Sequence, residues 1–525
     1  MTGSNPPTST VRAPHDMVAS ADQLATQAGL TMLALGGNAV DAAIATNAAI
    51  AVTAPHLCGM GGDLFALVHH HGEVHALNSS GRAGSGASAQ QLRAEGLVSM
   101  PMRNDVRSVT VPGCVDGWVA LHERFGSLPL GLVLRPAIEL AEGGFPASPL
   151  LVGSIAILDD RARASLAELV TQAARPAALV QRPGVARSLR AVATGGRAAF
   201  YTGEFGDGLL ALGDGWFAPA DLATSQCEWV APLCASAWGV DLWTMPPNSQ
   251  GYLTLGAAAL AAEFELPTDP DDPFFAHLLI EAATAAGHDR PDVLHDGAHG
   301  ADLLRAIAAR RDMIDLSRAS RRPMATGPGD TTYLCTADRT GMAVSLIQSN
   351  ASGFGSWLVE PNTQINLHNR GLGFSLQAGH PAELLAGRRP PHTLAPAFAT
   401  TDGELRAVFG TMGGDAQPQI LLQLAARLFH YGQSPAVAVN ASRWVLSGPS
   451  SGFDTWSAPD GPVVAIEGHA PPDWVDALTQ RGHRAFRSAP FDSAFGHAHV
   501  IVREPAGWWA GAADPRARIG SVAGR

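Results

Sequence analysis

The chain has 525 residues, of which 46% are hydrophobic and 16% charged, a composition typical of a globular protein with a sizeable core. The net charge of −12 argues against nucleic acid as a partner, and no run of Lys or Arg suggests a membrane surface or a phosphate site. The length allows two or three domains or one large fold. Five cysteines without a CxxC pair are typical of a reducing compartment.

The first segment, residues 1–15, is rich in Pro, Ser and Thr and is predicted to be disordered. It has no basic start followed by an apolar stretch, so no secretory signal is expected, and the expected compartment is the cytoplasm. Polar residues interrupt every long apolar stretch, so no membrane span is expected either.

Two helices are predicted next. Ser20 or Asp22 can cap a helix that runs to about Leu35, where a glycine pair ends it. Asn38 can cap a second helix that ends before Pro55. This second helix is Ala-rich and apolar all round, so we expect it to be packed on several sides.

A hairpin follows the second helix, with strands expected over residues 63–69 and 73–78. Three histidines at 69–71 lie at its tip, but no second cluster of metal ligands is nearby in the sequence. The glycine-rich loop before the hairpin lacks the Lys-Ser/Thr ending of a phosphate loop. No metal or phosphate site is predicted here.

Residues 150–320 are predicted to be mostly Ala-, Leu- and Arg-rich helices separated by Gly and Pro. Within them, a turn at 245–251 leads into a helix expected from about Tyr252 to Glu263. Residues 316–330, rich in Ser, Arg, Pro and Gly, indicate an exposed and flexible strip. Exposure of this kind is what a proteolytic cleavage site requires.

A second hairpin is predicted from Thr332–Ala337 and Met342–Gln348, joined by the loop Arg339–Gly341. Counting outward from this loop places Thr331 opposite Ser349, with their hydroxyls side by side at the open end. A dry core rarely places two hydroxyls there unpaired. The alternative is an ordinary edge hairpin whose threonines merely suit strands.

A third hairpin turns at residues 401–403, and its return strand runs into Gly413-Gly414. A helix then begins near Gln417-Pro418 and ends near Gly432. A strand, a glycine pair and a helix start can aim backbone N–H groups at a developing oxyanion. The alternative is a tight β-to-α turn.

These motifs together, with Gly353–Ser356 closing the central hairpin, resemble the γ-glutamyltranspeptidase family of N-terminal-nucleophile hydrolases. The resemblance covers almost the whole chain and is densest at residues 16–82 and 328–445. It implies that a precursor cuts itself between Asp330 and Thr331, so that Thr331 becomes both N-terminal residue and nucleophile.

The resemblance also assigns the fold and the other catalytic groups. Ser349 matches the family's second hydroxyl, and Gly413 and Gly414 match its oxyanion pair. The implied fold class is α+β, a four-layer αββα sandwich. Residues 16–330 and 331–525 would build it jointly as a heterodimer, possibly a dimer of heterodimers, and no metal or organic cofactor is implied.

The substrate-binding residues implied by the resemblance differ from those of typical transpeptidases. Arg82 stands about two positions later than the Arg that holds the substrate carboxylate, and a surface Arg is the alternative. Asn369 and Arg370 lie in the segment that follows the central hairpin. His392 and Thr393 replace two serines that contact the substrate, and both can still donate hydrogen bonds.

Two departures bear on substrate choice. Gly373 stands where transpeptidases carry the carboxylate that binds the substrate's α-ammonium, and Arg370 stands where a neutral side chain is usual. The chain is therefore more similar to the branch with oxamate amidohydrolases and cephalosporin-type acylases. We expect hydrolysis of a small amide whose acyl part carries a carboxylate, with Arg82 and Arg370 as clamps. Arg370→Asp is expected to change acyl preference more than processing.

Two other functions stay open, and a third is excluded. A true γ-glutamyl transferase or glutathione hydrolase would use the same nucleophile on a different acyl group. An unprocessed binding protein would keep the fold and lack the cleavage. A serine hydrolase with a Gly-x-Ser-x-Gly elbow is excluded, because no convincing serine stands in that context.

Overall fold

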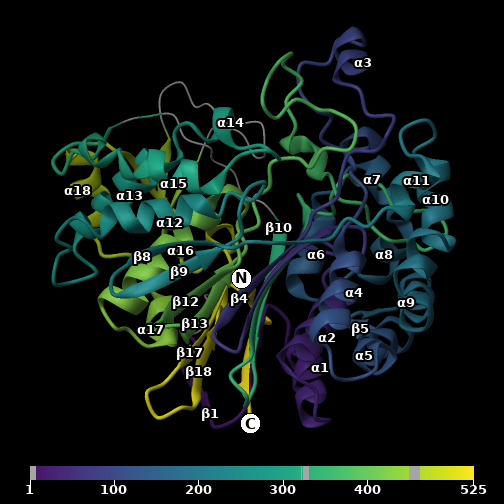
Figure 1. Cartoon of the computed structure of the whole chain (residues 1–525), viewed down its shortest axis with the longest axis horizontal. Helices are drawn as coiled ribbons and strands as arrows, with labels where there is room; N and C mark the ends of the chain where they lie inside the picture. The colour runs from purple at the N-terminus through teal and green to yellow at the C-terminus, as the bar shows by residue number, and fades with distance from the viewer. Residues whose placement is uncertain (1–6, 321, 323–329, 448–461) are drawn as a thin grey trace.

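A computed structural model of the chain describes residues 7–320, 322, 330–447 and 462–525. Two seven-stranded sheets lie face to face in the middle of the molecule, and helices cover the outer side of each sheet (Figure 1). This arrangement is the four-layer αββα sandwich that the sequence predicts, and the α+β class is confirmed.

The first sheet contains the predicted nucleophile. All its neighbouring strands are antiparallel, in the order β19 (Ser521–Gly524), β2 (Met17–Ser20), β10 (Asp330–Ala337), β11 (Ala343–Ala351), β3 (Asp63–His70), β4 (Glu73–Ser79) and β7 (Glu228–Val230). Strand β2 precedes the predicted cleavage point, yet it lies between β10 and β19, which follow it. The two predicted fragments therefore alternate within one sheet.

The second sheet is also antiparallel throughout. Its order is β1 (Val11–Ala13), β18 (Trp509–Ala513), β17 (Ala498–Arg503), β13 (Glu404–Thr411), β12 (Ala397–Thr401), β9 (Val240–Thr244) and β8 (Leu233–Ala237). Two small sheets comprise β14 (Trp444–Ser447), β15 (Val463–Ile466) and β16 (Arg484–Arg487), and β5 (Phe145–Pro146) with β6 (Leu179–Val180).

Two sequence predictions are wrong in part. Disorder was predicted for residues 1–15, but residues 11–13 form β1 because they pair with β18; residues 1–6 lie outside the described residues. The mainly helical interpretation of residues 150–320 missed β7, β8 and β9. These strands are only three to five residues long, too short for a clear alternating pattern, and pairing with neighbouring strands decides their conformation.

Helices form the two outer layers. The core of the first sheet includes α1 (Gln23–Ala34), α2 (Ala39–Thr53), α3 (Ala89–Ala94), α4 (Cys114–Phe125), α5 (Leu130–Gly143), α6 (Pro149–Ala156), α7 (Asp160–Ser165), α8 (Ala167–Gln172), α9 (Pro183–Tyr201), α10 (Glu204–Leu212) and α11 (Pro219–Ala223). The core of the second includes α12 (Tyr252–Ala261), α13 (Pro273–Gly287), α15 (Gly300–Ala308), α16 (Gln417–Ala425), α17 (Pro435–Asn440) and α18 (Trp474–Gln480). The short α14 (Arg290–Val293) lies at the top of Figure 1.

The predicted start of the helical layer is confirmed. Asp22 caps α1 by accepting from the Leu24 N–H at 2.8 Å, and Asn38 caps α2. Every residue of α2 is buried, because its small side chains allow neighbours on all sides. At Gly29 of α1 an added Cβ would lie 2.2 Å from the Thr46 hydroxyl, so this glycine permits the close approach of the two helices.

The central core lies between the two sheets. Tyr333 and Ile347 from the first sheet pack with Phe398, Val408 and Ile501 from the second. Strand β10 is therefore buried on both faces, which fixes the position of its first residues. None of the helices in the described parts of the chain has the length and apolar character needed to span a bilayer.

Candidate active site

The β10–β11 hairpin has the predicted turn. Asp338 N–H donates to the Met342 carbonyl at 2.9 Å, and Gly341 has φ +87°, a conformation that glycine adopts without strain. The ladder keeps one register from the turn out to the pair Thr332 and Gln348. Both strands are buried along their whole length except at Asp330.

A β-bulge follows at the open end of this hairpin, because Asp330 pairs with Ala351. Thr331 Oγ1 donates to Ser349 Oγ at 3.0 Å, and Ser349 Oγ donates to the Asp330 carbonyl oxygen at 2.7 Å. The Ala351 N–H donates to Ser349 Oγ at 2.8 Å. The predicted adjacency of the two hydroxyls is confirmed, and Ser349 bridges Thr331 to the carbonyl of the preceding peptide bond.

Arg370 reaches the same hydroxyl from the 3₁₀ turn Arg370–Gly373. Its Nη2 lies 3.5 Å from Ser349 Oγ, and its Nη1 donates to Thr393 Oγ1 at 3.2 Å. Burial lowers the pKa of Arg370 to about 10, so the guanidinium still carries its charge at neutral pH. A buried cation therefore stands beside Thr331 and Ser349.

Gly413 and Gly414 connect β13 to α16 through a single 3₁₀ turn. They have φ +137° and +56°, and the first of these values suits only glycine. Within the described parts of the chain, neither amide N–H has a hydrogen-bond acceptor. Gln250 Nε2 donates to the carbonyls of both Gly414, at 3.0 Å, and Thr393, at 2.9 Å. The glycine pair is thereby held next to Thr393, with two N–H groups available.

Three of the predicted substrate-binding residues have other partners. His392 Nδ1 accepts from the Leu394 N–H at 3.3 Å, and its Nε2 faces Asp63 at 3.2 Å. Burial and the charge of Arg370 lower the pKa of His392 to about 3, so the ring is neutral.

Asn369 and Arg82 likewise serve protein contacts. The Asn369 amide donates to the Met102 carbonyl at 2.8 Å and to Ser352 Oγ at 2.7 Å. The Arg82 guanidinium pairs with Glu228 at 3.7 Å, and its side chain is 30% exposed. Of the five predicted residues, Arg370 contacts Ser349 directly, and Thr393 contacts Arg370.

Asp63 is a buried residue that the sequence analysis did not single out. It lies opposite Ser349 in the β3–β11 ladder and accepts from the Gly81 N–H at 3.0 Å and the Gly113 N–H at 3.2 Å. Burial alone would raise the pKa of Asp63, but His368, His392 and the Gly81 N–H outweigh it, and the pKa lies below its ordinary value. An anion at this point offsets the charge of Arg370.

A cavity of about 470 Å³ lies next to this cluster. Its wall includes Arg290 and Gly373, with mostly apolar neighbours: Val98, Met100, Met102, Leu294, Leu372, Phe374 and Leu376. Because Gly373 ends the turn that begins at Arg370, this turn links the cavity to Ser349. The segments at 98–102 and 290–294 carry no recognisable motif, so this wall could not be predicted from the sequence.

Two features of the cavity bear on its occupant. A Cβ added at Gly373 would lie 2.4 Å from the Pro391 carbonyl oxygen, so no side chain fits there. Arg290 Nη2 pairs with Asp415 Oδ1 at 3.2 Å, and both side chains are buried. Asp415 directly follows Gly414, so this ion pair lies between the cavity and the glycine pair.

Known proteins resemble this chain over nearly its whole length. The family model for gamma-glutamyltranspeptidase matches residues 25–524. The chain is 34% identical to the oxamate amidohydrolase proenzyme of Klebsiella pneumoniae subsp. pneumoniae, with 97% of this chain and 98% of that protein covered. It is 32% identical to the glutathione hydrolase-like YwrD proenzyme of Bacillus subtilis, with 95% and 97% covered.

A solved structure is similar over the same length. The cephalosporin acylase from Bacillus halodurans superposes with a TM-score of 0.90 at 35% identity, and the match covers 98% of this chain and 97% of that one.

Proposed function

Because the chain belongs to the gamma-glutamyltranspeptidase family, we propose that it is a self-processing amide hydrolase that forms an acyl-enzyme on Thr331. The acyl group that we propose carries a carboxylate. The observation that carries the proposal is the chain of hydrogen bonds from Thr331 Oγ1 through Ser349 Oγ to the Asp330 carbonyl oxygen.

That chain of bonds supports a route for self-cleavage. As Thr331 Oγ1 attacks the Asp330 carbonyl carbon, its proton passes to Ser349, while Ser349 gives its own proton to the carbonyl oxygen. The C–N bond then breaks, the nitrogen takes up a proton, and an ester joins Asp330 to Thr331. Water hydrolyses this ester and leaves an Asp330 carboxylate and a Thr331 amine.

The freed amine supplies the base for turnover. An α-amino group has a pKa near ~8, so at neutral pH a part of the population can accept the proton of the Thr331 hydroxyl. The hydroxyl then attacks the substrate amide, and the N–H groups of Gly413 and Gly414 receive the oxyanion. Loss of one such donor costs about 3–4 kcal/mol in hydrolases that use an oxyanion hole. Water releases the acyl group, and Ser349 orients the Thr331 hydroxyl.

Arg370 is the proposed partner of the acyl carboxylate. It is buried, charged and within 3.5 Å of Ser349 Oγ, so a carboxylate a short distance from the scissile carbonyl would reach it. Oxamate, after which the Klebsiella pneumoniae relative is named, is such an amide. Arg82 is a weaker candidate than the sequence suggested, because its guanidinium pairs with Glu228.

A γ-glutamyl group is the second candidate acyl group. Its α-ammonium would need an anion near position 373, where the structure has a glycine without room for a side chain. The apolar wall of the 470 Å³ cavity instead favours a larger, less polar substituent on the acyl or amine side. We therefore favour an acylase or amidohydrolase over a transferase.

Two measurements test the proposal. Mass spectrometry of purified protein is expected to find fragments 1–330 and 331–525, and to find an intact chain of 54.4 kDa for Thr331→Ala. A panel of oxamate, glutaryl amides and γ-glutamyl anilide is then expected to show turnover of the first two in preference to the third. Turnover by an unprocessed chain would overturn the mechanism, and a preference for γ-glutamyl anilide would overturn the substrate class.

A further inference from the structure

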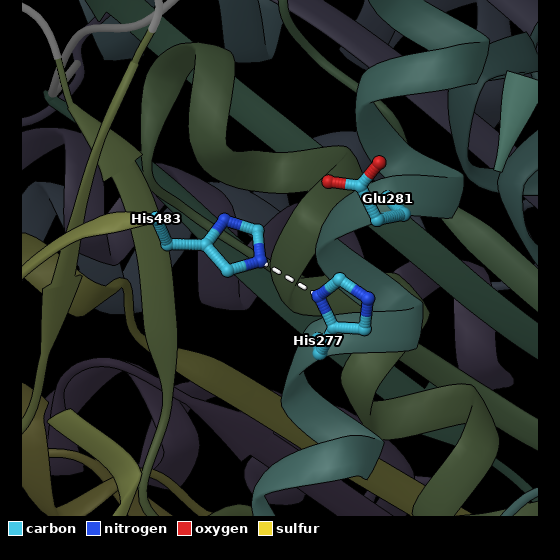
Figure 2. A group of neighbouring side chains, drawn as sticks. All are labelled: His277, Glu281 and His483. Carbon is cyan, nitrogen blue, oxygen red and sulfur yellow. Dashed lines mark hydrogen bonds between the residues drawn. The ribbon is translucent and has the colours of Figure 1, made fainter. Parts of the chain in front are cut away.

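A second group of chemically reactive side chains lies in the helical layer over the second sheet, away from Thr331. His277 and Glu281 are four residues apart on α13, so they lie on one face of the helix, and His483 follows α18. One ligand atom from each lies within 4.8 Å of the others, and all three residues are buried. Figure 2 shows the two imidazoles facing each other, with Glu281 one turn along the helix.

The distances suit a single metal ion. His277 Nδ1 and His483 Nε2 are 2.8 Å apart. Two imidazole nitrogens bound to one tetrahedral zinc ion are about 3.3 Å apart, given Zn–N bonds of about 2.0–2.1 Å. The rings therefore need to separate by only about 0.5 Å to admit an ion.

Main-chain groups already orient two of the three ligands. His277 Nε2 lies 2.9 Å from the Asp315 carbonyl oxygen, which can only accept, so this nitrogen carries the proton and Nδ1 offers its lone pair. The Glu281 carboxylate accepts from the Ser320 N–H at 3.1 and 3.2 Å. Histidine ligands in metal sites usually have such a carbonyl partner, and ligating carboxylates are usually hydrogen-bonded too.

The fourth position of a tetrahedral site is also available. A cavity of about 20 Å³, large enough for one water-sized ligand, touches Glu281 and His483. Arg322 and Arg484 line the same cavity. Their charges favour an anion, hydroxide or chloride, as the fourth ligand.

We propose that His277, Glu281 and His483 bind a zinc ion that joins the two cleavage products. Two nitrogens and one carboxylate oxygen suit Zn²⁺ better than Mg²⁺ or Ca²⁺, which prefer oxygen ligands. His277 and Glu281 belong to residues 1–330 and His483 to residues 331–525, so the ion would bridge the fragments. This role is structural and differs from the expectation of no metal. The bridge between the fragments rests on the proposed function, because it requires self-cleavage, whereas zinc binding does not.

Metal content and titration test the site. The purified full chain is stripped with a chelator, dialysed, and titrated with Zn²⁺ alone by calorimetry and elemental analysis. About one tightly bound zinc per chain is expected, since the cluster supplies three protein ligands. Glu281→Gln and His483→Gln are each expected to weaken binding by roughly 100-fold or more, since even partners of ligands account for 10–100-fold.

A matched control separates this site from the histidines at the tip of the first hairpin. The double variant His70→Asn with His71→Asn is expected to keep the bound zinc, since those rings contact each other at the β3–β4 turn and not α13. Absence of stoichiometric zinc in the stripped and refilled wild type would overturn the proposal. The proposal would also be overturned if zinc stays bound in Glu281→Gln and His483→Gln but is lost from the His70→Asn, His71→Asn variant.

Two further readouts cover variants that fold poorly. Co²⁺ added to the wild type is expected to give the visible absorption of a tetrahedral nitrogen and oxygen site, and an octahedral spectrum would contradict it. In mild denaturant, zinc is expected to delay separation of the fragments in the wild type but not in Glu281→Gln. If the chain stays uncut, the ion cannot bridge two fragments and the proposed function fails as well. The cobalt spectrum would still show whether the three side chains bind a metal ion.

Discussion

Ser349 Oγ donates to the carbonyl oxygen of Asp330 at 2.7 Å, from the strand next to the bond that the proposed mechanism cuts. The serine thus contacts the oxygen on which negative charge develops during self-cleavage. It also accepts from the Thr331 hydroxyl, so it can deliver one proton while it receives another.

Ser349→Ala is therefore expected to slow processing by about 10²- to 10⁴-fold, the range found for loss of a proton-transfer group. Ser349→Thr is expected to process, because the hydroxyl is kept. Time courses of the two fragments on denaturing gels measure the rate. Ser345→Ala removes another buried hydroxyl from the same strand, where it contacts Tyr333, and is expected to process like the wild type. If both alanine variants are slowed equally, the cause is disruption of strand β11 and not loss of proton transfer through Ser349.

Thr331→Ala is expected to stay uncut and inactive, because the nucleophile is lost. Thr331→Ser is expected to cut slowly. The neighbouring Thr332 provides a matched control, since its buried hydroxyl has no partner in the described part of the chain. Thr332→Val keeps the shape and should leave processing unchanged, as judged by mass spectrometry. Cleavage in Thr331→Ala would show that another group attacks the bond.

The hairpin that holds these residues could be read from the sequence because its signals are local. Gly341 marks the turn, and the count of residues outward from it fixes which hydroxyls meet. The caps Asp22 and Asn38 are equally local and were also found. Strand β7 was missed because its partner β4 is distant in sequence, whereas β8 and β9 form a local hairpin whose strands are too short to give a clear alternating pattern.

Arg370→Gln is expected to lower kcat/KM for carboxylate-bearing acyl amides by about 10- to 100-fold, the worth of one hydrogen bond to a charged group. Neutral acyl amides should be affected less. Gln is a cleaner test than Asp, which would add a third acid near Asp63 and Asp415. Arg82→Gln is the control and should change little, because that guanidinium pairs with Glu228. The reverse order of effects would restore Arg82 as the clamp.

Asp330 should make the stability of the uncut precursor depend on pH. Burial raises the pKa of Asp330 to about 6, against the opposing charge of Arg103. The fold therefore favours protonated Asp330. The contribution of this carboxyl to the free energy of unfolding is complete below the unfolded pKa of 3.8 and is lost as the pH rises through about 6.

In the Thr331→Ala background, Asp330→Asn should therefore stabilise the precursor at pH 8 relative to pH 4. The expected gain is about 1–3 kcal/mol, reduced from the full value because Asp330 is partly exposed. Denaturant unfolding at the two pH values measures it. If Asp330→Asn changes the free energy of unfolding equally at both pH values, ionisation of the Asp330 carboxyl does not destabilise the fold.

Gly413→Ala is expected to lower kcat by about 10²- to 10³-fold, the cost of displacing one oxyanion donor. Its φ of +137° is strained for any residue with a Cβ, so the peptide must rotate. Gly432→Ala also puts a Cβ at a positive φ, +62°, but lies beyond α16 and outside the glycine pair, so it should reduce stability without reducing kcat. If kcat is unchanged in both variants, the N–H groups of the glycine pair do not stabilise the oxyanion.

The candidate site was only partly predictable for physical reasons. Thr331, Ser349 and the glycine pair lie in motifs whose spacing defines their geometry. Asp63 and the Arg290–Asp415 pair depend on segments that only the folded chain brings together. His392 and Asn369 were assigned to substrate by position, but their hydrogen bonds go to the protein.

The position of β2 between β10 and β19 has a consequence for the mature protein. A cut before Thr331 creates a new chain end but no new boundary, because the main-chain ladders of the two pieces remain shared. The nicked molecule is expected to melt as one cooperative unit, and neither polypeptide, produced by itself, has a complete sheet to fold around.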